Sequence, residues 1–252
     1  MALIQVDDNL TAYRSGPSGP VKGGLILIHE IWGLVDHIRD VADRFAAEGY
    51  LVIAPDLLSG IGIVPEVGLE LQSLVFNADQ ATRTAAQPLL RDRLVPARAP
   101  EFAVWAVDAL TKTVDYLIEQ PGVAGRVAVS GFCFGGGYAF ALAAADTRVR
   151  AAVPFYGHAP AGTGVEDISC PVLAFYGDQD ASLMETLPAV SAALTGASVD
   201  FTAEVYPGVG HAFFNDTNSM TYDADAATDA WTRTLSFLNK QLANEKTLTD
   251  IP

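Results

Sequence analysis

Cys133 stands where a nucleophile could act. It is the centre of Gly-Phe-Cys-Phe-Gly at 131–135, after an apolar run from 127 and before a run of small residues. A nucleophile between two such glycines, on a strand-to-helix turn, is exposed by a sharp bend in the backbone. The free N–H groups and the dipole of the following helix favour a thiolate or an oxyanion there. The pattern alone also fits a glycine-rich turn around an ordinary buried cysteine.

A cysteine nucleophile needs a base, and the base needs a group that orients it. Two histidines follow Cys133, and the second, His211, stands in a glycine-rich turn after an expected strand. Between them, Asp178 and Asp180 follow another expected strand. Taken separately, the histidine could be a surface residue and either aspartate a helix N-cap. Together they stand at strand ends in the order nucleophile, acid, histidine, which indicates acyl-transfer chemistry.

Glu30 is a further candidate, because it follows the continuous apolar run 24–28. A carboxylate at the end of a buried strand is costly unless it has a partner. The residue is therefore either functional or a structural acceptor that holds the following loop.

Apolar runs alternate with amphipathic segments, which predicts a mostly parallel sheet covered by helices on both faces. We find no repeat and no linker, so residues 1–252 are expected to form a single domain. Residues 57–100 are less regular and are expected to form loops and short helices over a site. The expected strands are 24–28, 50–54, one from 127, 151–157, 172–177 and 200–206, and the expected helices include 101–119, about 183–194 and about 222–242.

Composition limits the possible partners and location. The chain carries a formal charge of −15 at pH 7, which argues against binding to nucleic acid or to an anionic membrane surface. No apolar run reaches the ~18 residues of a membrane span, and no secretory signal is visible. Two cysteines give no disulfide framework, so a cytoplasmic location is expected.

Five motifs make the chain resemble the dienelactone hydrolase, or carboxymethylenebutenolidase, family of the α/β-hydrolase fold. They are His-Glu-Ile-Trp-Gly-Leu at 29–34, Ala-Pro-Asp-Leu at 54–57, Gly-Phe-Cys-Phe-Gly-Gly at 131–136, Tyr-Gly-Asp-Gln-Asp at 176–180 and Gly-His-Ala-Phe at 210–213. They spread the resemblance over nearly the whole chain. It implies an esterase that acts as a monomer.

The resemblance also assigns roles by position. Cys133 matches the family nucleophile, His211 its base, and Asp180 rather than Asp178 its acid. Glu30 matches a glutamate that lies beside the resting thiol and takes part in its activation. The family's oxyanion hole uses backbone N–H groups that match those of Ile31 and Phe134.

One position departs from the family pattern. Family members that bind the dienelactone carboxylate carry an arginine four residues after the catalytic histidine, and Asn215 stands there in this chain. The replacement removes a charge-assisted contact to substrate. Trp32, Phe213 and Phe214 indicate either a more apolar acyl pocket or part of the core. The residues expected to bind substrate are Trp32, Phe213 and Asn215. The second family arginine has four candidates, namely Arg83, Arg91, Arg93 and Arg98.

The sequence thus predicts a hydrolase of small-molecule esters or lactones that forms a thioacyl-enzyme with a Cys-His-Asp triad. No cofactor and no metal are expected, because the four histidines show no ligand spacing and no phosphate loop is present. The alternative is a catalytically weak α/β-hydrolase scaffold that binds a small ligand.

Overall fold

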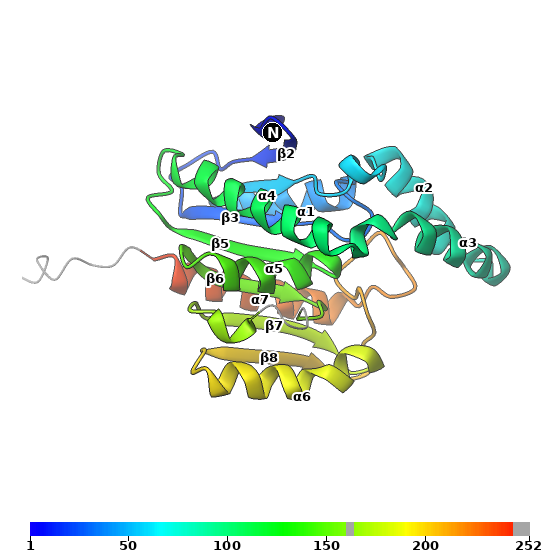
Figure 1. Cartoon of the computed structure of the whole chain (residues 1–252). Coiled ribbons are helices and arrows are strands. Elements are labelled where there is room, and N and C mark those ends of the chain that lie inside the picture. Colours follow the sequence, from blue (N-terminus) through cyan, green and yellow to red (C-terminus); the bar gives the residue numbers. More distant parts are fainter. Residues whose placement is uncertain (160–163, 244–252) are drawn as a thin grey trace, which may run out of the picture.

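The computed structural model describes residues 1–159 and 164–243. Its strands form one sheet in the order β1-β2-β4-β3-β5-β6-β7-β8 (Figure 1). The strands are β1 (Ala2–Asp7), β2 (Leu10–Ser15), β3 (Gly23–Ile28), β4 (Tyr50–Pro55), β5 (Val127–Phe132), β6 (Val149–Phe155), β7 (Val172–Gly177) and β8 (Phe201–Tyr206).

The sheet is mostly parallel, as expected. Only β2 runs against its neighbours, β1 and β4, and all other pairs are parallel. Every residue of β3, β4, β5 and β7 is buried. Such continuous burial is the reason that these strands read as unbroken apolar runs instead of alternating patterns.

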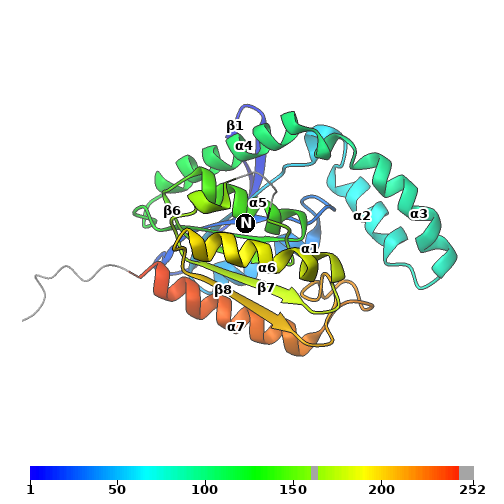
Figure 2. The ribbon, with the colours of Figure 1, turned by 60° about the horizontal axis from the view of Figure 1, so that its bottom comes forward.

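Helices cover both faces of the sheet, which confirms the second part of the fold prediction. On one face lie α1 (Asp36–Ala47) and α7 (Ala224–Gln241), whose Phe45 and Trp231 rings are 4.4 Å apart between centroids. On the other lie α4 (Pro100–Ile118), α5 (Phe134–Ala145) and α6 (Ala181–Gly196) (Figure 2). Within the described ranges, no helix combines the length and the apolar character that a bilayer crossing requires.

Residues 57–100 are more regular than expected. They contain α2 (Pro65–Val75) and α3 (Gln80–Arg93), flanked by the 3₁₀ turns η1 (Ser59–Ile61) and η2 (Pro96–Arg98). Figures 1 and 2 show the α2–α3 hairpin standing out from the sheet on the side toward which the parallel strands point. Several of the glycines and prolines that suggested loops lie within these helices. Gly68 of α2 lies directly against the Trp32 carbonyl.

The turn at Cys133 is held by backbone contacts that leave no room for side chains. A Cβ on Gly131 would collide with the Gly135 carbonyl, and one on Gly135 would collide with the Ile28 carbonyl at the end of β3. Gly136 and Gly157 likewise lie against each other's backbone. The first turn of α5 is therefore pressed between the ends of β3 and β6.

We expect Gly157→Ala to destabilise the protein by about 1–3 kcal/mol or more, because its methyl group would meet the backbone of α5 and force it to move. Gly196→Ala, at the end of α6 with open space around it, is the matched control and should be neutral or slightly stabilising. Denaturant unfolding measures both. Equal stabilities for the two variants would show that the α5 turn has room to adjust.

Candidate active site

Cys133 occupies a strained backbone position at the end of β5. Its φ is 56° and its ψ is −113°, conformations that residues other than glycine rarely adopt and that cost of order 1–3 kcal/mol. The Cys133 N–H donates to the Phe155 carbonyl at 3.0 Å, and its own carbonyl accepts from Gly137 at 3.2 Å. These bonds hold the sulfur at the N-terminus of α5, at the carboxyl ends of the parallel strands.

His211 and Asp180 meet at the same edge of the sheet. The Nδ1 atom of His211 lies 2.5 Å from Asp180 Oδ2, which leaves Nε2 of the imidazole for another partner. Asp180 also caps α6 by accepting from the Leu183 N–H at 3.4 Å. The same aspartate is therefore both a helix N-cap and the partner of His211. Asp178 lies apart from the imidazole and accepts from Gly208 and Gln179.

The charges at this edge shift the pKa of both partners. Burial disfavours the charged form of His211, but hydrogen bonds to Asp180 and Cys133 outweigh it and raise the pKa of His211 to about 10. Burial acts to raise the pKa of Asp180, yet the His211 hydrogen bond and charge hold it below its usual value. An imidazolium beside a carboxylate and a sulfur is thus the favoured state of this group.

Glu30 is buried, with 4% of its surface exposed, and takes hydrogen bonds from two neighbours. Asn215 Nδ2 donates to Oε2 at 2.6 Å, and the Tyr156 hydroxyl lies 3.5 Å from Oε1. Burial raises the pKa of Glu30, and the charge of His37 and the Asn215 bond offset only part of that rise. Burial therefore favours the protonated form of this carboxyl group more than water would.

Two backbone N–H groups near the sulfur are available to a ligand. Phe134 is the first residue of α5, where an N–H has no acceptor within the helix. The Ile31 N–H donates to no backbone carbonyl in the described part of the chain. Both residues line the same cavity as Cys133.

This cavity has a volume of about 330 Å³, which suits a small molecule. Its polar lining comes from the cysteine, two histidines, one tyrosine and one arginine, and none of its lining residues is acidic. The lining residues are Ile31, Leu94, Ala97, Arg98, Cys133, Phe134, Gly137, Tyr156, His158 and His211. Leu94, Ala97 and Arg98 come from the segment that was expected to cover a site.

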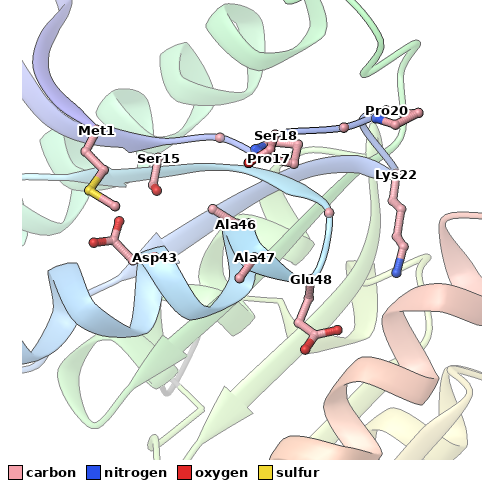
Figure 3. A pocket seen from close by; sticks show the side chains of 13 residues that line it. Met1, Ser15, Pro17, Ser18, Pro20, Lys22, Asp43, Ala46, Ala47 and Glu48 are labelled. Carbon is pink, nitrogen blue, oxygen red and sulfur yellow. The ribbon is translucent and has the colours of Figure 1, made fainter.

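A second hollow lies at the opposite ends of the strands (Figure 3). It includes Lys22 and Gly49, the residues that precede β3 and β4, and its lining contains no cysteine or histidine. One of its acids, Asp43, is already hydrogen-bonded by Tyr13. Its larger volume, about 540 Å³, therefore comes without a cysteine–histidine pair.

The three residues expected in the substrate pocket have other contacts. Trp32 packs edge-on against Phe76, and Phe213 is fully buried. Asn215 is also fully buried, and its Oδ1 accepts from the backbone and hydroxyl of Thr217 at 3.0 and 2.6 Å. Because Oδ1 is occupied by donors, the amide nitrogen must face Glu30. Of the four candidate arginines, Arg98 lines the cavity.

Sequence reasoning missed Tyr156 and the neighbours of Asp180. Tyr156 has a φ of 38°, lines the cavity, and packs its ring 5.1 Å from that of His211. The Ser182 hydroxyl donates to Asp180 Oδ1 at 3.0 Å and lies 3.3 Å from His158 Nε2. The position of Tyr156 at the carboxyl end of a parallel strand is the signal that could have found it.

No cluster of three or more metal-ligating side chains occurs within the described ranges.

Comparison with known proteins decides the family. The sequence model of the Dienelactone hydrolase family matches residues 10–242. The chain belongs to this family. It is 32% identical to a Saccharolobus solfataricus protein named as a carboxymethylenebutenolidase, over 92% of this chain and 94% of that protein. It is also 32% identical to an Escherichia coli protein of the same name, over 96% and 86% of the two chains.

A solved structure agrees with this assignment. A Klebsiella pneumoniae protein named as a dienelactone hydrolase superposes with a TM-score of 0.76 at 29% identity, over 97% of this chain and 98% of that one. The fold is therefore that of the α/β-hydrolases, as expected from the sequence. As a dienelactone hydrolase family member, the protein is an ester-cleaving hydrolase with a small-molecule ester or lactone substrate.

The raised pKa of His211 leads us to expect that the free energy of unfolding depends on pH. A group whose pKa rises from about 6.5 in the unfolded chain to about 10 in the folded one stabilises the fold fully below pH 6.5, and that contribution is lost as the pH rises through 10. The free energy of unfolding of wild type minus that of His211→Gln should therefore be largest near pH 6 and shrink toward pH 10. A difference that stays constant across this range contradicts the assigned ion pair.

Proposed function

We propose that this protein hydrolyses small esters or lactones through a thioacyl-enzyme, with Cys133 as nucleophile, His211 as general acid and base, and Asp180 as the group that orients the imidazole. The observation that carries the proposal is the 2.5 Å contact between His211 Nδ1 and Asp180, on a histidine that shares a cavity with Cys133. The contact fixes one ring nitrogen and directs the other toward the sulfur, the arrangement that an activated nucleophile needs.

Acylation begins with the Cys133 thiolate paired with the His211 imidazolium. The sulfur attacks the carbonyl carbon, and the electron pair of the C=O bond moves to oxygen. The N–H groups of Ile31 and Phe134 stabilise this oxyanion, and the loss of one such donor typically raises the barrier by ~2.7–4 kcal/mol. Collapse of the adduct breaks the bond to the alkoxide, which takes the proton from His211 Nε2.

Deacylation uses the same groups in reverse. His211, now neutral, removes a proton from water, and the hydroxide attacks the thioester carbonyl. The second oxyanion collapses, the thiolate leaves, and the carboxylic acid product departs. Asp180 stays ionised throughout and stabilises the imidazolium each time it forms.

Glu30 is proposed to take part in activating the thiol. Support comes from its burial, its raised pKa, and the Tyr156 hydroxyl that hydrogen-bonds it. Burial raises the pKa of Tyr156, and the charges of Glu30 and Cys133 raise it further, so this hydroxyl stays protonated within electrostatic reach of both groups. Asn215 is proposed to hold the carboxyl group in place, a role that differs from substrate binding.

The test compares turnover of p-nitrophenyl acetate and of dienelactone by wild type and by Cys133→Ala. We expect Cys133→Ala to lose at least about 10³-fold in kcat/KM, since the covalent route is removed. Cys170→Ala is the matched control and should keep its activity, because Cys170 is buried and burial raises the pKa of its thiol to about 11. Iodoacetamide should accordingly label Cys133 first.

Retention of full activity by Cys133→Ala would exclude the thioacyl route. Absence of turnover by the wild type on both substrates would favour a ligand-binding scaffold instead. Faster labelling of Cys170 than of Cys133 would contradict the assignment of the reactive thiol.

A further inference from the structure

We propose that His29 is a positioning residue that aims the Ile31 N–H at the substrate oxygen. The inference rests on the proposed function, since it concerns one of the two oxyanion donors of that mechanism. His29 directly follows β3 and precedes Glu30, yet it does not line the cavity. Its effect on the reaction must therefore pass through the backbone.

The hydrogen bonds of His29 fix its tautomer. The side chain is fully buried, and the Leu57 N–H donates to Nε2 at 3.1 Å. A nitrogen that accepts a hydrogen bond carries no proton, so the ring proton of neutral His29 resides on Nδ1. Nδ1 lies 2.7 Å from the Glu30 carbonyl oxygen and therefore donates to it. Burial lowers the pKa of His29, which keeps the ring neutral.

The acceptor of this bond belongs to the same peptide unit as the Ile31 N–H. In a trans peptide the C=O and N–H groups are coplanar and point in opposite directions, and the described chain has no cis peptide bonds. The Glu30 carbonyl accepts from His29 on one side and from the Gly33 N–H at 3.1 Å on the other. Two donors on the oxygen thus set the direction of the Ile31 N–H.

The same bonds also strengthen the donor. A hydrogen bond to a carbonyl polarises its peptide unit and makes the attached N–H a better donor. In addition, the His29 ring stacks on the Phe134 ring, with 5.8 Å between centroids and 3° between planes. One buried imidazole therefore contacts the peptide unit that carries the Ile31 N–H and the side chain of Phe134, the other proposed oxyanion donor.

The Ala-Pro-Asp-Leu motif at 54–57, which the triad alone does not use, takes part in these contacts. Leu57 closes the Ala-Pro-Asp-Leu motif that follows the body of β4. Its N–H is the donor that prevents His29 from adopting the other tautomer. The loop after β4 is thereby connected to the oxyanion donor at the end of β3.

The test separates oxyanion stabilisation from thiol reactivity. His29→Leu removes both hydrogen bonds, and we expect the acylation rate with p-nitrophenyl acetate to fall about 10- to 100-fold. Alkylation of Cys133 by iodoacetamide passes through no carbonyl oxyanion, so its rate should stay within about twofold of wild type. His29→Gln should restore most of the acylation rate, because its amide supplies one donor and one acceptor.

Thr113→Val serves as the control for loss of a buried hydrogen bond elsewhere, since the Thr113 hydroxyl donates to the Ala109 carbonyl inside α4. It should leave both rates near wild type. Wild-type acylation by His29→Leu overturns the inference, as does an equal fall in acylation and alkylation. Activity in Cys133→Ala would instead show that the proposed function has failed.

If His29→Leu does not fold, the wild-type protein still tests the two hydrogen bonds of His29 on which the inference rests. Nitrogen-15 NMR of the histidine rings should show His29 as the neutral Nδ1–H tautomer between pH 6 and 9. An Nε2–H tautomer, or a protonated ring, would overturn the inference, because neither permits the observed pair of bonds.

Discussion

The site depends on how closely the first turn of α5 approaches the strand ends beside it. Gly135 and Gly136 permit backbone contact with the ends of β3 and β6, and Gly131 permits backbone contact with Gly135, where any side chain would collide. The contact forces Cys133 into a positive φ and sets its sulfur above the sheet edge, at a helix N-terminus. The strain of that residue is compensated by the large buried core of the sheet, so the position of the proposed nucleophile is determined by the whole fold.

The other proposed site residues lie at the same edge of the sheet as Cys133 because parallel strands bring their carboxyl ends to one edge. Glu30 follows β3, Tyr156 follows β6, Asp180 follows β7 and His211 follows β8. The carboxyl group of Glu30 and the imidazole of His211 each have a hydrogen-bond partner that fixes their direction, namely Asn215 and Asp180. Because the partners are buried or half-buried, their charges shift each other's pKa values more than they would in water.

The sheet, its helices and the motifs at the strand ends could be predicted from the sequence, since buried parallel strands and glycine-rich turns have clear local signals. The α2–α3 hairpin could not, because Gly68 and Pro88 inside its helices read as loop residues. Asn215 was expected to touch substrate, and only the structure shows that it is buried and donates a hydrogen bond to Glu30. The position of Tyr156 at the end of a parallel strand marks it as a candidate, but a single chain does not show where its hydroxyl points.

The most direct measurement is intact-mass analysis, with peptide mapping, of enzyme quenched in acid during turnover of p-nitrophenyl acetate. A covalent route through sulfur predicts one added acetyl group, located on the peptide that contains Cys133 and removed by hydroxylamine. An acetyl group on another side chain, or rapid turnover with no trapped adduct at Cys133 at any quench time, would contradict the account.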